Sequence, residues 1–205
     1  IGQPHGDIAS ISFHPSKVVT TGDGGMLTTA NPDWDARFRL WRQHGMDVQT
    51  TVRHGSRKVI FESYPEVAYN YRMTDIQAAV GREQLKRLPE MIDRRRFLAE
   101  RYRQLLADVP GVTAPEEPNW ARSNWQSYCI RLPDGSDQQA VMQHMLDQGV
   151  ATRRGIMCSH REPAYADVPC PWSLTESERA QDHGVILPLY QQMTEEDQDY
   201  VVDTL

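Results

Sequence analysis

The sequence predicts an α/β protein built in two parts, and three observations lead to that prediction. A β-rich run at residues 7–13 precedes a glycine-rich turn, helical patterns occupy residues 74–107, and strand and helix signals alternate after Pro110-Gly111. We therefore expect one part at residues 1–89, a connecting helix at residues 90–109, and a smaller α/β or α+β domain at residues 110–205.

Composition excludes several classes of protein. The 39% of hydrophobic residues is enough for a core, and the net charge of −6 (22 − 28) gives no basic surface for nucleic acid. No apolar run approaches the ~20 residues of a membrane span, and we expect no signal segment because the start lacks a basic stretch followed by an apolar one. The three cysteines fit free thiols in a reducing cytoplasm, and their spacing matches no zinc site: Cys129, Cys158 and Cys170. We predict a cytoplasmic protein with no metal, and the start at Ile1 rather than Met predicts a fragment.

The first part begins with a short β-ribbon. Residues 8–13 form the first strand and residues 25–29 the return strand, and glycines at the turn permit the positive φ that it needs: Gly22, Gly24 and Gly25. Asn31-Pro32 then begins a helix, whose apolar side chains recur at spacings of four and three until Gly45 ends it: Trp34, Phe38 and Trp41.

A long irregular segment separates this helix from the next. Residues 45–72 have no clear periodicity, and connections of this length are usually functional or mobile. A capping box at residues 74–77 begins a helix that we expect Pro89 to end, followed by a second helix at residues 90–107. We expect the arginine run at residues 94–96 to lie on the solvated face of that helix.

The second part alternates strands and helices. We expect strands at residues 112–114, 125–132 and 150–152. Helix-capping patterns occur at three places: residues 136–139, 175–178 and 194–197.

Lys17 is the main candidate for chemistry. It lies on a short turn directly after the first strand and before the glycine turn, which is a suitable place for a lysine that bonds covalently to pyridoxal phosphate (PLP). Because most lysines are only solvated surface charges, its position alone does not decide the matter.

Two longer segments resemble the DegT/DnrJ/EryC1/StrS family of sugar aminotransferases. The line from Gly6 to Gly25 is similar to the lysine segment of the family, and Tyr69-Asn70-Tyr71-Arg72-Met73-Thr74-Asp75-Ile76-Gln77-Ala78-Ala79 is similar to a second signature. A third, looser match is Leu187-Pro188-Leu189-Tyr190 followed by residues 194–198. The resemblance implies the C-terminal part of a fold type I PLP-transferase large domain, followed by a smaller C-terminal domain.

The resemblance also implies roles for individual residues. Lys17 matches the lysine that holds PLP covalently, and Ser12 matches a serine that hydrogen-bonds the PLP phosphate. Asn70 matches an asparagine that reaches the phosphate in the neighbouring subunit, which implies a homodimer with a shared active site. Without the family, Ser12 would be a strand-end serine and Asn70 a residue of a turn before a helix.

Further positions are candidates for binding substrate. Arg53, Arg57 and Lys58 suit the phosphates of a nucleotide-linked sugar, although a solvated basic loop is an equal alternative. His160 lies in a segment similar to one that borders the sugar site in relatives, with a surface histidine as the alternative. Asp23 stands where the family usually has Glu.

The resemblance implies a PLP-dependent transfer of nitrogen from an amino acid, glutamate by family habit, to a nucleotide-linked keto-sugar. A sugar dehydratase with the same cofactor is an alternative, but those relatives carry histidine in place of Lys17. A non-catalytic, regulatory or truncated member is another. The residues that pair with the pyridine nitrogen and stack on the ring fall upstream of position 1 in the family pattern, so we do not expect the chain alone to be active.

Overall fold

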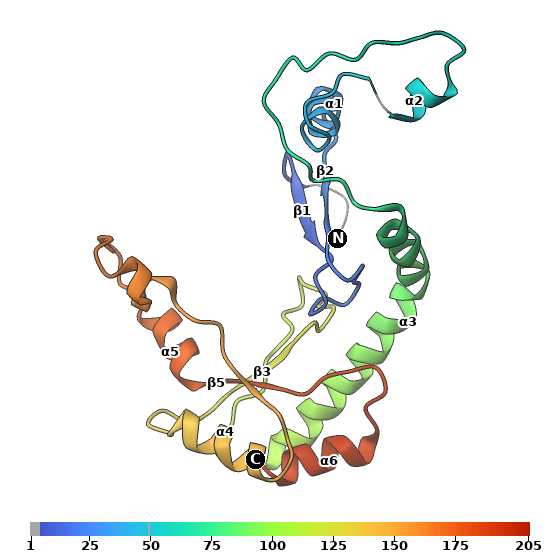
Figure 1. Ribbon diagram of the computed structural model, residues 1–205. Coiled ribbons are helices and arrows are strands. Elements are labelled where there is room, and N and C mark those ends of the chain that lie inside the picture. The colour runs from blue at the N-terminus through green and yellow to red at the C-terminus, as the bar shows by residue number, and fades with distance from the viewer. Residues whose placement is uncertain (1–4, 49) are drawn as a thin grey trace. The chain divides into compact units, whose positions relative to one another are not determined.

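The computed structural model describes residues 5–48 and 50–205, which fall into two compact units, Ile1–Leu88 and Pro89–Leu205 (Figure 1). One helix, α3 (Asp75–Leu105), begins in the first unit and continues into the second. The domain boundaries that we expect at residues 89 and 109 stay a prediction.

The first unit contains the expected ribbon and helix. Strands β1 (Ala9–Ser12) and β2 (Gly25–Thr28) pair antiparallel, with Ser12 opposite Gly25. Helix α1 (Pro32–Trp41) begins as predicted, because the Asn31 side chain accepts hydrogen bonds from two backbone N–H groups of the first turn. A short helix, α2 (Thr50–Gly55), follows.

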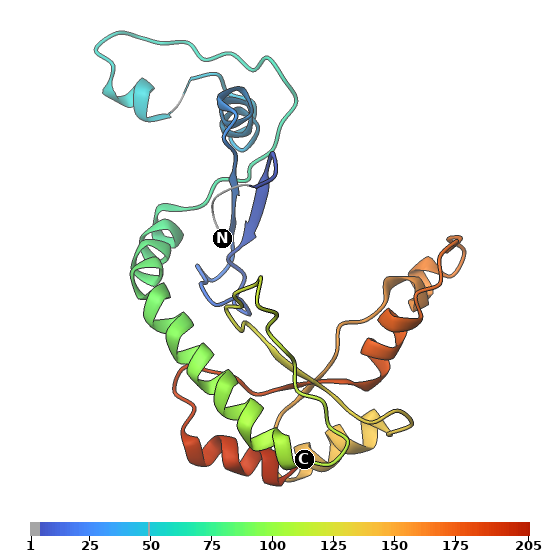
Figure 2. The ribbon, with the colours of Figure 1, turned by 180° about the vertical axis from the view of Figure 1, so that it is seen from behind.

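The irregular segment returns to the end of α1, as the trace between α2 and α3 shows (Figure 2). Its backbone pairs with the residues that follow α1, through an antiparallel bridge between Gln43 and Asn70. Backbone hydrogen bonds join Tyr69 N to Trp41 O (3.0 Å) and Tyr71 N to Arg42 O (2.9 Å). The segment is therefore held by main-chain pairing over its last residues.

Pro89 does not end a helix, so the prediction of two helices is wrong. It lies inside α3, which is continuous over 31 residues. A proline removes one backbone donor from the helix and crowds the preceding turn, which usually costs ~3 kcal/mol. Burial of the following turns offsets that cost, because Met91, Leu98 and Tyr102 are buried.

The arginine run of α3 is not a solvated face, which corrects the second expectation for this helix. Arg94 donates to the carbonyls of Gln191 and Met193, whereas Arg95 donates to those of Trp125 and Gln126. Arg96 bonds both carboxylate oxygens of Glu117 and the carbonyl of Ser123. Arg94 therefore binds the loop between β5 and α6, whereas Arg95 and Arg96 bind two stretches of the loop that precedes β3.

The second unit is a three-stranded antiparallel sheet with helices. Its strands are β3 (Tyr128–Arg131), β4 (Arg153–Arg154) and β5 (Gly184–Leu187), in the order β3-β5-β4. Its other helices are α4 (Gln138–Asp147), α5 (Thr175–His183) and α6 (Glu195–Asp203). Three single turns of 3₁₀ helix complete it: Leu106–Asp108, Ser159–Arg161 and Pro163–Tyr165.

Two of the strands that we expected differ. Residues 112–114 contribute one bridge, Thr113 to Arg131, and β4 lies just after the expected residues 150–152. The capping box of α6 is present as predicted, whereas α5 has no side-chain cap.

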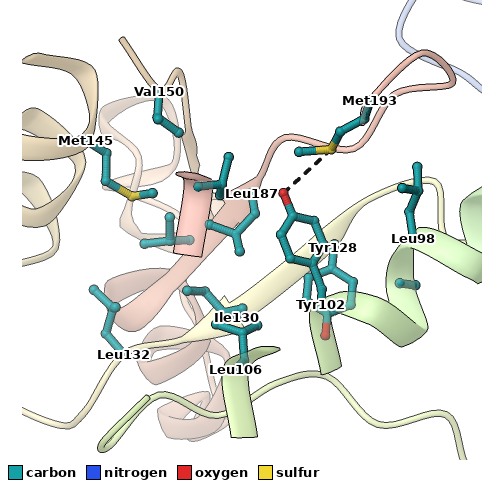
Figure 3. Close-up of a cluster of buried hydrophobic side chains, with 13 residues drawn as sticks. Leu98, Tyr102, Leu106, Tyr128, Ile130, Leu132, Met145, Val150, Leu187 and Met193 are labelled. Carbon is teal, nitrogen blue, oxygen red and sulfur yellow. Dashed lines mark hydrogen bonds between the residues drawn. The ribbon is translucent and has the colours of Figure 1, made fainter. Parts of the chain in front are cut away.

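The core of the second unit lies between α3 and the sheet (Figure 3). The rings of Tyr102 and Tyr128 are 5.1 Å apart, and both residues are fully buried. Around them lie aliphatic side chains from every large element of the unit except α5: Leu98, Leu106, Ile130, Leu132, Met145, Val185, Leu187 and Val201.

The described residues contain neither a helix suited to cross a membrane nor a cluster placed to hold a metal ion. None of their helices combines the length and apolar character needed to cross a membrane. Within residues 5–48 and 50–205, no group of three or more His, Cys, Asp or Glu side chains is placed to hold a metal ion.

Candidate active site

Lys17 lies in a loop that closes on the end of β1. The carbonyl of Phe13 accepts hydrogen bonds from Thr21 N (3.1 Å) and Thr20 Oγ1 (2.9 Å), so both ends of the loop meet there. Lys17 N donates to His14 O (2.9 Å), and the residue is half-buried. Within the described part of the chain, the Lys17 amine makes no ion pair and no hydrogen bond.

Ser12 is the last residue of β1 and is exposed. Its Oγ accepts a hydrogen bond from His14 N at 3.3 Å, a long contact that leaves the hydroxyl hydrogen free to donate. Ser12 and Lys17 are thus at the two ends of one short segment. The His14 ring bonds Ser16, its neighbour in the loop, through Nδ1 (2.9 Å to Oγ).

The glycine turn packs on the first turns of α3. Thr21 is buried, and its Oγ1 donates to the carbonyl of Asp23 (2.6 Å). The same carbonyl accepts a hydrogen bond from Nε2 of Gln77 (3.0 Å), in the first turn of α3. A Cβ added at Gly81 would lie 2.9 Å from Thr21 Cγ2, so the helix and the turn are in direct contact.

Asn70 is exposed on the paired segment that precedes α3. The rings of its neighbours, Tyr69 and Tyr71, stack on each other at 5.0 Å and 8°. Because successive side chains of an extended backbone alternate, Asn70 points away from the face that carries the two rings. Its backbone bridge to Gln43 fixes its position relative to α1.

Side-chain contacts of Glu66 with two residues of α1 also hold the same segment to that helix. Glu66 accepts hydrogen bonds from Trp41 Nε1 (2.6 Å) and Arg37 (3.3 Å), and the Arg37 guanidinium lies over the Trp41 ring at 4.7 Å. Glu66 lies four residues before Asn70, so these side-chain contacts add to the backbone pairing of the segment.

The three cations of the irregular segment differ in their surroundings. Arg53, on α2, pairs with Glu62 at 2.8 Å. A backbone hydrogen bond and the Arg53 guanidinium lower the pKa of Glu62 below its ordinary value. Arg57 and Lys58 are exposed, and neither makes an ion pair with another described residue.

His160 lies in the second unit, on the 3₁₀ turn Ser159–Arg161. Its Nε2 is 2.8 Å from Glu178 Oε1, on α5, and the next residue, Arg161, pairs with Asp182. His160 lines a hollow of about 700 Å³ whose other walls are mostly apolar, including Met157, Tyr165 and Trp172.

The structure therefore places Ser12 at the end of β1 and Lys17 on the loop that follows it, and places Asn70 and the three cations on the other segments of the first unit. Sequence reasoning missed the contacts of Thr21, Gln77 and Gly81. One signal was available, because an isolated glycine within a helical pattern often has a packing reason.

The model of the DegT/DnrJ/EryC1/StrS aminotransferase family matches residues 1–205.

The chain belongs to this family. GDP-perosamine synthase of Caulobacter vibrioides is 35% identical over 98% of this chain and 52% of its own length. The dTDP-4-dehydro-2,3,6-trideoxy-D-glucose 4-aminotransferase of Saccharopolyspora spinosa is 35% identical over 90% of this chain and 48% of its own length. The chain thus spans about half the length of the curated relatives that it matches.

Solved structures agree with the family assignment. The PLP form of Spr1654 from Streptococcus pneumoniae superposes with a TM-score of 0.82 at 26% identity, covering 99% of this chain and 52% of that one. The predicted family and the α/β fold class are thereby confirmed. The roles of the individual site residues stay predictions.

The residues around Lys17 fit PLP, which membership of the family implies. The donor set offers an amine with no counter-ion among the described residues for the aldehyde carbon, and the hydroxyl of Ser12 with a hydrogen to donate to phosphate.

Proposed function

We propose that the protein is a PLP-dependent aminotransferase that moves nitrogen from an amino acid, glutamate being the expected donor, to a keto-sugar linked to a nucleotide. The observation that carries the proposal is Lys17, a half-buried residue whose amine makes no ion pair in the described part of the chain. The names of the two relatives, one GDP-linked and one dTDP-linked, support a nucleotide-sugar without selecting the nucleotide.

Bound PLP supplies an electron sink for the carbon that gains or loses nitrogen. The residues of this chain would hold and orient it. Lys17 Nζ would attach the cofactor covalently and, when released, move a proton as a general base. Ser12 Oγ would donate to the phosphate, and the hydrogen bonds of Thr20 and Thr21 to Phe13 hold the backbone of the loop that carries Lys17.

We propose that the active site is shared by two copies of the chain, with Asn70 reaching the phosphate bound to the other copy. The surroundings of Asn70 support this. Large apolar side chains of its segment are almost fully exposed, with relative exposures of 85% for Val59, 90% for Phe61 and 94% for Val67. Monomeric proteins rarely leave so much apolar surface in water, and such surfaces usually mark an interface.

The cations Arg57 and Lys58 are proposed ligands of the nucleotide phosphates, because they are exposed on the same segment. Arg53 has a carboxylate partner in Glu62 and would have to exchange it for phosphate. His160 is proposed to border the sugar. Its bond to Glu178 fixes the orientation of its ring.

The first experiment tests attachment of the cofactor. Mixing the full-length protein with PLP should produce the visible absorbance of the lysine-bound cofactor, and Lys17→Ala should abolish it. Lys86→Ala is the matched control, because Lys86 is exposed and pairs only with Glu83 among the described residues. A band that survives in Lys17→Ala shows that the assignment of Lys17 is wrong.

The second experiment tests the reaction. Glutamate labelled at its amino nitrogen is incubated with the protein and a panel of nucleotide-linked keto-sugars, and the label is expected in the sugar product. Loss of water without gain of nitrogen would identify a dehydratase instead. Bound PLP without either reaction across the panel would favour a regulatory role. A relative named "erythromycin biosynthesis sensory transduction protein EryC1", from Saccharopolyspora erythraea, is a reason to include this outcome.

A further inference from the structure

We propose that the first turns of α3 position Lys17, with Gly81 leaving the space and Gln77 providing the hydrogen bond that keep the lysine loop closed. Both are positioning residues, and neither lies in the lysine segment itself. The inference rests on the proposed role of Lys17 as the attachment point of the cofactor.

The loop that carries Lys17 is closed at one atom. The Phe13 carbonyl accepts from Thr20 and Thr21, and Phe13 N donates to Gly24 O (2.9 Å). Phe13 and Val19 are buried, so packing of their side chains also holds the loop in place. The position of the Lys17 backbone therefore follows that of Thr21 and of the glycine turn.

Helix α3 contacts the end of the lysine loop at Thr21. Its exposed fraction is 5%, and a Cβ at Gly81 would approach its Cγ2 to 2.9 Å, closer than two carbon atoms can pack. The threonine methyl thus occupies space that only a glycine at position 81 leaves. A larger residue there would have to displace Thr21 and, with it, the hydrogen bonds of Thr21 Oγ1 to Asp23 O and of Thr21 N to Phe13 O.

Gln77 adds a second connection one turn earlier. Its Nε2 donates to Asp23 O, while its Oε1 accepts from Thr74 N (3.0 Å) and completes the helix cap. One side chain therefore joins the start of α3 to the turn that follows Lys17. The two functions lie on different atoms, which allows them to be separated by mutation.

The presence of glycine at position 81 supports a specific role. Glycine is among the least favourable residues within a helix, since it loses the most backbone freedom on folding. Alanine would suit the helix better, and only the contact with Thr21 explains in the structure why it is absent. The same argument does not apply to Gly55, at the end of α2, where a Cβ would meet nothing within 4 Å.

The test measures which lysine becomes attached to PLP, rather than enzyme activity. The sequence contains three lysines, Lys17, Lys58 and Lys86, so two exposed lysines serve as internal references. Full-length protein is mixed with PLP and reduced with borohydride, and the labelled peptides are quantified by mass spectrometry. In the native protein, Lys17 should carry most of the label.

Gly81→Ala should lower the label on Lys17, relative to the two references, by about tenfold, since displacement of a reacting group by ~1 Å can have effects of that size or greater. Adding Thr21→Ser removes the methyl that clashes and keeps Oγ1, so the double variant should regain most of the native ratio. Gly55→Ala is the matched control and should leave the ratio unchanged. Circular dichroism checks that each variant is folded.

Gln77→Glu keeps the acceptor that caps the helix and removes the donor to Asp23. It should also lower the label on Lys17, and it decides the matter if Gly81→Ala does not fold. The proposal is overturned if both variants label Lys17 as the native protein does, or if Thr21→Ser fails to rescue Gly81→Ala. Equal labelling of the three lysines in the native protein would instead refute the proposed function.

Discussion

The two tyrosines of the second unit give a sharp test of how its core is stabilised. The Tyr102 hydroxyl donates to Pro188 O at 2.9 Å, and Met193 Sδ lies 3.7 Å away (Figure 3). The Tyr128 hydroxyl is equally buried, but it has no hydrogen-bond partner among the described residues. The same substitution, tyrosine to phenylalanine, should therefore have opposite effects at the two positions.

The magnitudes follow from what each hydroxyl does. Tyr102→Phe removes a part-buried hydrogen bond and leaves the Pro188 carbonyl without this donor, which should lower the free energy of unfolding by about 1–2 kcal/mol. Tyr128→Phe removes a hydroxyl that lost its water on folding and gained nothing, so it should be neutral or stabilising by up to about 1 kcal/mol. Both variants keep the ring pair, so ring packing cancels in the comparison.

Urea unfolding followed by fluorescence measures the difference. For a chain of this size the two midpoints should differ by about 0.5–1 M, with unchanged slopes. An equal loss of stability in both variants would refute the reasoning, because it would mean that the Tyr128 hydroxyl makes a bond of similar value. Tyr102→Ala is a useful reference, since loss of the whole ring should cost about 3–5 kcal/mol.

Two further predictions concern pH and the segment of Asn70. Burial raises the pKa of Tyr128 to about 12, so the unfolded chain loses this proton first as the pH passes about 10. The free energy of unfolding should thus fall between about pH 10 and 12, less steeply in Tyr128→Phe, as urea midpoints across that range would show. Glu66→Ala removes the acceptor of Trp41 and so loosens the segment that carries Asn70, the proposed ligand of the PLP phosphate. It should raise the Kd for PLP about fivefold, the equivalent of one hydrogen bond, whereas Glu66→Gln should have a smaller effect. Spectrophotometric titration with PLP checks this, and equal Kd values in Glu66→Ala and the native protein would contradict it.

Short-range signals in the sequence predicted the helix starts. Asn31-Pro32 and Thr194–Asp197 form the caps that their residue types predict, because both donor and acceptor lie within four residues of each other. The ribbon that carries Lys17 was predictable for the same reason. Its strands, its glycines and its lysine are all local features of one segment.

The contacts that position the site could not be predicted in this way. The contact of Thr21 with Gly81 joins residues 60 positions apart, and the pairing of Gln43 with Asn70 joins residues 27 positions apart. The identities of Thr21 and Gln43 do not indicate their partners, since threonine and glutamine are found in many surroundings. Only the family resemblance selected Asn70, and nothing in the sequence selected Glu66.

The arginine run shows why a charged pattern on a helix is ambiguous. Consecutive helical residues point about 100° apart, so three in a row cannot share one face, solvated or buried. Loops of the second unit leave carbonyls that need donors. The guanidinium of a long arginine side chain can reach them while the aliphatic part of that side chain covers apolar surface. Arg94 binds the loop before α6, and Arg95 and Arg96 bind separate carbonyls of the loop before β3, so each of the three adjacent guanidiniums has its own acceptors. The sequence shows the three donors together but distributes their acceptors over 77 residues, from Glu117 to Met193, and only the fold brings the acceptors to the helix.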